Sequence, residues 1–283
     1  NTIFDSTQPA IACDRRFVYL VWQEDSFVYL ATYDGRRWTR AKPLSANAAS
    51  HPKIAATQTF PDNLVYVVWE RIDAKGRSIA EITYSLDQGR IWRVPEPVTN
   101  GPWETAEPNV GSGSRSTFIV WRDHREATSQ VYVRRFDETI GGDEFRLASP
   151  GKARRPGVQV LDQQVIVVWE NRSNNIDPAN IFNVGSFDLG ETWSVSQQVS
   201  QNTAESILAQ PFFLSDQMGV FWQDGSSGDW EIHFSLLLDG QREETRFTQS
   251  DGSAIQPSVG LSHGQAHLVW INRANSVQSS VVY

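Results

Sequence analysis

A two-residue landmark, Val-Trp or once Phe-Trp, recurs six times along the chain, each time at the end of a short apolar run. A proline precedes each of these tryptophans, and in four of the six copies the separation is 13 residues. The tryptophans are Trp22, Trp69, Trp121, Trp169, Trp222 and Trp270, and the prolines are Pro9, Pro52, Pro108, Pro156, Pro211 and Pro257. Because two landmarks keep their order through six copies, the chain is built from six internal repeats.

Each repeat reads as four short strands separated by turn residues. The second copy contains the segments PKIAATQ, LVYVVW, IAEITYS and EPVTN, which are rich in β-branched and aromatic residues. Helices are not expected, because we find no segment with a convincing apolar stripe of helical period. Four-stranded units of about 40–50 residues, repeated four to eight times, are typical of a β-propeller. We therefore predict an all-β, six-bladed β-propeller.

The last repeat, residues 257–283, has room for only three strands. Residues 2–7 resemble the fourth strands of other repeats, so we expect the N-terminal strand to complete the last blade. Such closure removes exposed sheet edges that would otherwise invite aggregation. The whole chain is then a single domain, residues 1–283, with blades at approximately 8–50, 51–106, 107–154, 155–209, 210–255 and 256–283 together with 1–7.

Composition excludes several classes of protein. No run approaches 18 apolar residues, so we expect no membrane insertion. A net charge of -8 argues against a nucleic-acid partner. The only cysteine, Cys13, excludes an internal disulfide and a cysteine-based zinc cage. Since the chain starts at Asn1 with no Met and no signal-like apolar run, we expect a processed or trimmed product.

Two segments share a second motif, Ser-x-Asp-x-Gly followed by a tryptophan. The motif residues are Ser85, Asp87, Gly89 and Trp92 in the second repeat, and Ser186, Asp188, Gly190 and Trp193 in the fourth. They resemble the Asp-box, or bacterial neuraminidase repeat, although Ile91 stands where that motif has Thr. The resemblance implies a sialidase-superfamily propeller with the box between the third and fourth strands, away from the active site. A structural role fits, because Asp can accept backbone N–H bonds and Gly supplies an unusual φ.

Polar residues that precede the repeat prolines or follow the repeat tryptophans are expected to meet near the propeller axis. The first set is Gln8, His51, Glu107, Arg155, Gln210 and Gln256. The candidate ligand-binding residues on this face are Arg155, Arg122, Arg172, Arg71, Arg273, Glu107 and His51, together with two tryptophans outside the repeat, Trp103 and Trp230. Arginine suits an acidic ligand, because guanidinium binds carboxylates bidentately. The alternative is that these arginines bridge to acidic residues and that the two tryptophans pack over blade edges.

The catalytic machinery of sialidases is not evident. The family's first arginine lies in Arg-Ile-Pro in the first blade, where this chain has Gln8-Pro9; the nearest match, Arg154-Arg155-Pro156, comes three blades later. No tyrosine lies between Tyr132 and Tyr283 to pair with a glutamate as nucleophile. The catalytic residues are therefore unknown. A carboxylate-pair glycosidase would have to draw on four acidic candidates, Glu70, Glu107, Asp123 and Glu170.

Three functions remain open from the sequence. The first is a non-catalytic module that recognises a glycan or protein on the axial face. The second is an exo-sialidase-type glycoside hydrolase, and the third is a structural subunit of a larger surface complex. We expect no cofactor and no metal, because the five histidines lack a metal-ligand spacing. The expected location is extracellular, periplasmic or at the cell surface.

Overall fold

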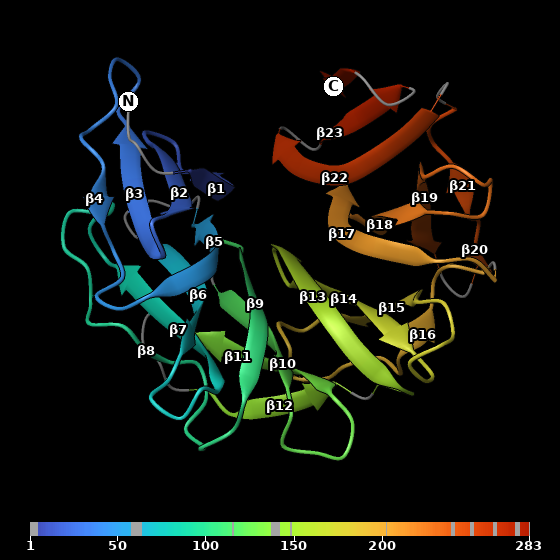
Figure 1. The fold of residues 1–283 in the computed structure, drawn as a ribbon, viewed down its shortest axis with the longest axis horizontal. Helices are drawn as coiled ribbons and strands as arrows, with labels where there is room; N and C mark the ends of the chain where they lie inside the picture. The colour runs from blue at the N-terminus through green and yellow to red at the C-terminus, as the bar shows by residue number, and fades with distance from the viewer. Residues whose placement is uncertain are drawn as a thin grey trace. The chain divides into compact units, whose positions relative to one another are not determined.

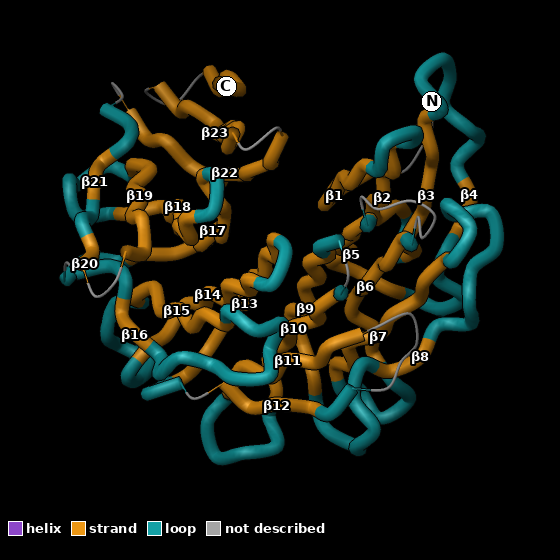
Figure 2. The backbone as a smooth tube through the Cα atoms, turned by 180° about the vertical axis from the view of Figure 1, so that it is seen from behind, coloured by secondary structure: helices purple, strands orange, loops and turns teal. Residues whose placement is uncertain are grey.

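The computed structural model describes ten stretches of the chain. They are residues 5–57, 64–114, 116–136, 142–147, 149–201, 203–238, 241–249, 252–262, 265–274 and 278–282. These residues form strands, turns and loops but no helix, which confirms the all-β prediction for the described part of the chain (Figure 2). In that part, accordingly, no helix has the length and apolar character that crossing a membrane requires.

Contacts divide the chain into two compact units. The first unit comprises residues 1–127 and 132–146, and the second comprises residues 128–131 and 147–283. Whether the two together form the predicted single, closed domain stays a prediction. Each unit is described by itself below.

The first unit carries three antiparallel sheets of four strands (Figure 1). The first sheet consists of β1 (Ser6–Cys13), β2 (Val18–Glu24), β3 (Phe27–Tyr33) and β4 (Lys42–Pro43). The second consists of β5 (Ala49–Ala56), β6 (Val65–Ile72), β7 (Ser78–Ser85) and β8 (Glu96–Pro97). The third consists of β9 (Thr105–Ser112), β10 (Thr117–Asp123), β11 (Gln130–Phe136) and β12 (Glu144–Leu147). Strands follow one another in chain order across each of these sheets.

The second unit carries three more sheets, two of which depart from four strands. The fourth sheet consists of β13 (Lys152–Leu161), β14 (Gln164–Arg172), β15 (Asn180–Ser186) and β16 (Gln197–Gln198). The fifth consists of β17 (Ser206–Leu214), β18 (Gln217–Asp224), β19 (Glu231–Leu238), β20 (Gln241–Arg242) and β21 (Thr245–Arg246). The sixth consists of β22 (Gly252–Ser262), β23 (Gln265–Ala274) and β24 (Gln278–Val282).

Successive sheets pack face to face through apolar side chains within each unit. In the first unit Tyr19 and Val21 of β2 share a buried cluster with Val67 of β6. In the second unit Val168 of β14 shares a buried cluster with Val220 of β18. The alternating pattern of each strand places these side chains on the faces that meet, so burial of apolar area stabilises the stack of sheets.

The repeated proline and tryptophan mark one structural device, a β-bulge. In the first sheet Thr7 pairs with Gln23 and Ala10 pairs with Val21, so two residues, Gln8 and Pro9, oppose the single residue Trp22. The same break in register faces Trp69, Trp121, Trp169, Trp222 and Trp270. Proline is tolerated at a bulge because no ladder hydrogen bond needs its missing N–H.

Two details differ from the sequence-based expectation. In the fifth sheet the bulge lies at Leu208 and Ala209, because Ile207 pairs with Gln223 and Gln210 already pairs regularly with Phe221. Gln210 is therefore not equivalent to the residues before the other repeat prolines. The first sheet also begins earlier than predicted, since Ser6 and Thr7 pair with β2 rather than serving the last sheet. Residues 1–4 lie outside the described residues, so closure of the sixth sheet by the N-terminus stays a prediction.

Candidate functional site

The bulges define one end of every sheet, which we call the bulge end; the opposite end, where β1 turns into β2 and β3 into β4, is the turn end. At each bulge a non-glycine residue has a positive φ, between 45° and 56°. These residues are Gln8, His51, Glu107, Arg155, Leu208 and Gln256. A positive φ is unfavourable for residues with a Cβ and costs of order 1–3 kcal/mol. Strain repeated at one place in six sheets marks the bulge end as the part of the fold to search for function.

The bulge residues are held by side chains of the preceding sheet. The backbone N–H of Glu107 donates to Oε1 of Glu70 at 2.7 Å, and that of Leu208 donates to Oε1 of Glu170 at 2.9 Å. Side-chain amide oxygens serve as acceptors in two other sheets. The backbone N–H of His51 donates to Oε1 of Gln8, and that of Gln256 donates to Oε1 of Gln223. We call these contacts latches, since each joins two neighbouring sheets at the bulge.

Three sheets also carry a pair of oppositely charged or polar side chains across the bulge. In the second sheet Nδ1 of His51 lies 3.8 Å from Glu70, and in the fourth Arg155 donates to both oxygens of Glu170 at 2.9 Å. The third sheet has the reverse order, with Glu107 at the bulge and Nε of Arg122 3.3 Å from its carboxylate. The predicted candidates Arg122, Arg155, Glu107 and His51 thus face partners in their own sheets.

A second set of carboxylates serves the repeat tryptophans themselves. The indole N–H of Trp121 donates to the fully buried Asp123 at 3.0 Å, and that of Trp222 donates to the fully buried Asp224 at 3.1 Å. Trp69 donates to Glu81 in the same way. A buried indole N–H needs an acceptor, so these acids support the fold rather than a ligand.

The remaining arginine candidates are distributed differently. Arg71 pairs with Glu81 at 2.6 Å, and Arg172 contacts Glu205 and donates to the backbone oxygen of Asp177. Arg273 is exposed on β23, where it pairs in register with Ser253. The interpretation that arginines at this end bridge to acidic residues is thus realised for Arg71, Arg122, Arg155 and Arg172, and their role in binding stays a prediction.

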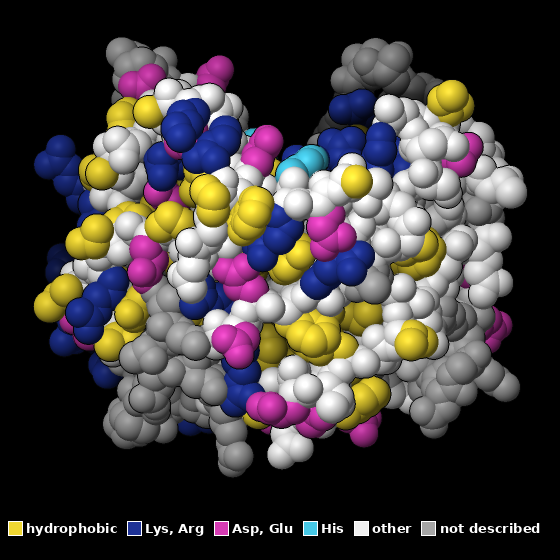
Figure 3. Space-filling model, turned by 90° about the horizontal axis from the view of Figure 1, so that it is seen from below, with side chains coloured by type: hydrophobic (Ala, Val, Ile, Leu, Met, Phe, Trp, Pro, Cys, Tyr) yellow, Lys and Arg dark blue, Asp and Glu magenta, His cyan; other side chains and the backbone are white. Residues whose placement is uncertain are grey.

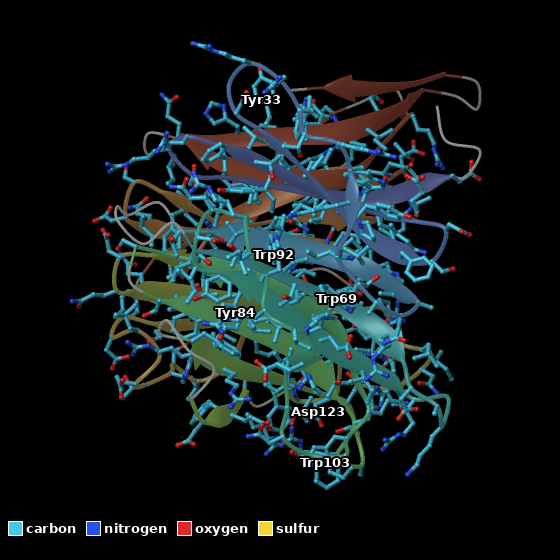
Figure 4. The ribbon with its side chains drawn as sticks, turned by 90° about the vertical axis from the view of Figure 1, so that its left-hand side faces the viewer. Tyr33, Trp69, Tyr84, Trp92, Trp103 and Asp123 are labelled. Atoms are coloured by element: carbon cyan, nitrogen blue, oxygen red, sulfur yellow. The ribbon has the colours of Figure 1, made fainter. Side chains whose placement is uncertain are left out.

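Trp103 belongs to a cation–π cluster at the bulge end of the third sheet. The guanidinium of Arg125 lies 4.0 Å from the ring centre of Tyr132 and 5.5 Å from that of Trp103. Burial disfavours the charge of Arg125, but hydrogen bonds to Asp123 and Glu144 raise its pKa. Trp103 itself is 40% exposed, so one part of its ring remains open to a ligand (Figure 4).

Trp230, the other tryptophan outside the repeat, is half-buried in the loop before β19. Its ring packs beside Gly225, where an added Cβ would stand 3.5 Å from the indole. The backbone N–H of Trp230 donates to the Ser253 hydroxyl and its backbone carbonyl accepts from Ala254 N–H, so the loop is tied to the sixth sheet. These contacts favour the packing interpretation for Trp230.

The two Asp-box-like turns share one hydrogen-bonding pattern between the third and fourth strands. Oδ1 of Asp188 accepts from Ser186 at 2.8 Å and from the backbone N–H of Thr192 at 2.9 Å. Asp87 accepts from Ser85 and from Ile91 N–H in the same way. Thr192 also donates its hydroxyl to Asp188, and these bonds lower the pKa of that carboxyl to about 2. The motif side chains therefore build turns at the turn end.

Potential metal-ligating atoms gather at one place in the described residues. Atoms of Asp224, His233 and Glu244 lie within 4.8 Å of one another. However, His233 already shares a 2.8 Å hydrogen bond with Glu244, and Asp224 accepts bonds from Ser206 and Trp222. The arrangement is a hydrogen-bonded cluster, and no metal role follows from it.

Comparison with known proteins gives a fold but no sequence family. No family model matches the chain, and no curated protein matches it. A Dyadobacter fermentans protein of unknown function has a similar structure, with a TM-score of 0.65, 10% identity, and coverage of 99% of this chain and 94% of that chain. A Penicillium chrysogenum α-L-arabinanase, solved with arabinobiose, gives 0.63 at 14% identity, covering 98% and 93%. The Hadza microbial sialidase Hz136 gives 0.51 at 16%, covering 78% of this chain and half of that chain. These likenesses show a β-propeller type of fold.

Proposed function

We propose that this protein is a glycan-binding β-propeller that recognises uncharged sugar hydroxyls at the bulge end of its sheets. One observation carries the proposal: in the first unit, polar contacts run without interruption across three sheets. Gln8 accepts from His51, Glu70 accepts from Glu107, and Glu107 faces Arg122. In a closed propeller this strip, which we call the polar strip, would belong to the axial face.

The charges of the polar strip favour a neutral ligand over an acidic one. The polar strip holds two carboxylates, Glu70 and Glu107, but only one permanent cation, Arg122, so it has no excess of positive charge to attract an anion. Sugar hydroxyls both donate and accept hydrogen bonds, so one hydroxyl can bridge a carboxylate and a guanidinium. Two structurally similar proteins, an arabinanase and a sialidase, are named for acting on glycans, which supports a glycan as ligand. Polymeric glycans outside the cell would match the expected extracellular or surface location.

A glycan array followed by calorimetric titration of the best ligand tests the proposal. The side chain of His51 is 56% exposed, so His51→Ala should weaken binding about tenfold with little effect on stability. His267→Ala is the matched control, because His267 is exposed near the turn end of the sixth sheet. Equal affinity of the two variants, or an array without any bound glycan, would contradict the proposal.

A glycoside hydrolase is the second candidate, because Glu70 and Glu107 lie on neighbouring sheets and are joined by a backbone hydrogen bond. Two nearby carboxyl groups are the minimum that glycosidic bond hydrolysis requires. The other two acidic candidates are committed elsewhere, since Asp123 is tied to Trp121 and Arg125 and Glu170 to Arg155. Release of sugars from arabinan or sialosides by the wild type, abolished in both Glu70→Gln and Glu107→Gln, would establish the hydrolase.

A further inference from the structure

Three of the connections at the turn end of the first unit differ in charge from the rest of this acidic chain. They are residues 14–17 and 34–41 of the first sheet and residues 86–95 of the second. Together they carry seven exposed arginines, Arg15, Arg16, Arg36, Arg37, Arg40, Arg90 and Arg93. The same connections hold three carboxylates, Asp14, Asp34 and Asp87, so their net charge is 7 − 3 = +4, whereas the whole chain carries -8.

Each of the three carboxylates accepts hydrogen bonds from backbone N–H groups of its own turn. Asp14 accepts from the backbone N–H groups of Arg16 and Phe17 at 2.7 Å, and Asp34 accepts from those of Arg36 and Arg37 at 2.9 Å. The positive charge of Arg37 makes a small contribution that favours the ionised form of Asp34, and the charge of Arg90 does the same for Asp87. In the described part of the chain, no ion pair joins any of the seven arginines to a carboxylate. Their guanidinium groups thus remain available to an external anion.

The three connections lie next to one another in the first unit. The connections 14–17 and 34–41 lie at the same end of the first sheet. They are two strand spacings apart, which corresponds to about 10 Å. The third belongs to the second sheet, and Nζ of Lys42 donates to the Gly89 carbonyl at 3.3 Å, which ties it to the first sheet. Figure 3 shows Lys and Arg side chains interspersed with hydrophobic ones along its left-hand edge, the side on which Figure 1 draws β3, β4 and β8.

Apolar side chains accompany the arginines. Trp38 is 47% exposed, and its ring packs against Tyr33 with ring centres 5.3 Å apart. Ile91 and Val94, in the connection of the second sheet, are more exposed still. An aromatic ring fixed by a neighbour on one side presents its free parts at low entropic cost. We call Trp38, Ile91 and Val94, together with the seven arginines, the basic patch.

We propose that the basic patch binds an acidic polysaccharide, with carboxylate or sulfate groups on the arginines and a sugar ring on Trp38. An array that extends over two sheets is too long for one small anion, but it matches a polymer with repeated charges. Arginine rather than lysine fills every cationic position of the patch, and its planar fork recognises carboxylate and sulfate bidentately. The exposed tryptophan favours a saccharide over an acidic polypeptide. This site lies at the end opposite the polar strip and does not depend on the function proposed there.

Affinity electrophoresis in gels containing polygalacturonate, dextran sulfate or neutral dextran tests the proposal with the full chain. The wild type should be retarded by at least one of the two acidic polymers, not by dextran, and the retardation should weaken as salt is raised. Arg36→Ser with Arg37→Ser should weaken binding about tenfold. Lys75→Ser with Arg146→Ser is the matched control, because it removes two exposed charges outside the patch. Trp38→Ala should weaken binding without changing the salt dependence.

Specific outcomes would overturn the proposal. Equal retardation by polyglutamate would assign the patch to acidic polypeptides, and sedimentation with phosphatidylserine vesicles but not polysaccharide would assign it to membranes. No retardation by either acidic polymer, or an equal loss in the control variant, would show that the patch is only a solvated surface. Loss of array binding by His51→Ala with intact retardation would separate the polar strip from the patch.

Discussion

Acidic residues do different work at the two ends of the sheets. At the bulge end, Glu70 and Glu170 accept hydrogen bonds from the backbone of the next sheet, so each carboxylate joins elements distant in sequence. At the turn end, Asp87 and Asp188 accept hydrogen bonds from residues no more than four positions away. The first arrangement determines how sheets are joined, and the second determines the shape of one turn.

Arginine follows the same division. The bulge-end arginines Arg71, Arg122 and Arg155 face carboxylates and are neutralised. At the turn end of the first sheet, backbone N–H groups occupy Asp14 and Asp34, and the neighbouring arginines are left to solvent. Because the carboxylates there bind backbone N–H groups and not guanidinium groups, the neighbouring arginines form a basic surface on an acidic protein. Variants of each kind should separate the two regions by the size and the nature of their effects.

The largest effect is expected for Asp123→Ala at the bulge end. Asp123 is fully buried and accepts hydrogen bonds from the Trp121 indole and from Arg125. Its removal leaves the buried Trp121 indole N–H without its acceptor and takes one of two carboxylate partners from Arg125, which keeps Glu144. We expect this to cost about 2–4 kcal/mol. Urea unfolding measures the change, and Asp229→Ala, an exposed loop position, should stay within about 0.5 kcal/mol. A similar small change for Asp123→Ala would mean that the carboxylate does not support the fold.

A smaller effect is expected when a latch loses its charge but keeps an acceptor. Glu170→Gln retains one carbonyl oxygen for the Leu208 N–H but weakens the bonds from Arg155. We expect a loss of about 1–2 kcal/mol in urea unfolding, because a charge-assisted bond becomes neutral. The neutral latch at Gln223 shows that an amide oxygen suffices for the backbone contact. A loss as large as that of Asp123→Ala would indicate that the ion pair, and not the latch, is the principal interaction.

At the turn end, ionisation of Asp188 should make the stability of the protein depend on pH. Hydrogen bonds from Thr192 and Ser186 lower the pKa of Asp188 to about 2, below the value of about 3.9 expected in the unfolded chain. The folded state therefore binds a proton less readily, and the stabilisation is fully present above about pH 5 and fades as pH falls toward 2. The wild type should thus exceed Asp188→Asn in melting temperature at pH 7, with the difference shrinking in acid. A difference independent of pH would contradict the assigned hydrogen bonds.

Local patterns in the sequence were sufficient to predict the turn end. Ser85, Asp87 and Gly89 contact one another within five residues, and the resemblance of this short motif to the Asp-box implied a turn between the third and fourth strands, which the structure has. The same holds for the strands, because the alternation of apolar residues depends only on neighbours along the chain. The available arginines beside Asp14 and Asp34 were missed, although Arg-Arg after an Asp turn residue appears twice in the printed sequence.

The bulge end was predicted only in part. The repeat prolines marked equivalent positions in five sheets without predicting a bulge there, and the fifth sheet has Ala209 where the others have proline. The separation of 11 residues between Pro211 and Trp222 gave no reliable signal, because Pro52 and Trp69 are 17 residues apart and the bulge of the second sheet still lies at Pro52. No sequence pattern could assign the latches, because the partner of each backbone N–H lies in another sheet. Closure of the six sheets and the ligand likewise depend on long-range arrangement.

The smallest effect, and the finest test of the turn end, concerns the one residue by which the two Asp-box-like turns differ. Thr192 donates its hydroxyl to Oδ2 of Asp188 at 2.6 Å, whereas Ile91 offers Asp87 only its backbone N–H. Ile91→Thr should add the missing hydrogen bond and remove an exposed apolar side chain, which stabilises the protein by about 0.5 kcal/mol. It should also lower the pKa of Asp87 further, toward that of Asp188, which an NMR titration of the carboxyl detects. The converse change, Thr192→Ile, should raise the pKa of Asp188. If neither carboxyl responds, the threonine hydroxyl is not a partner of the aspartate, and the two turns owe their shared shape to serine and glycine alone.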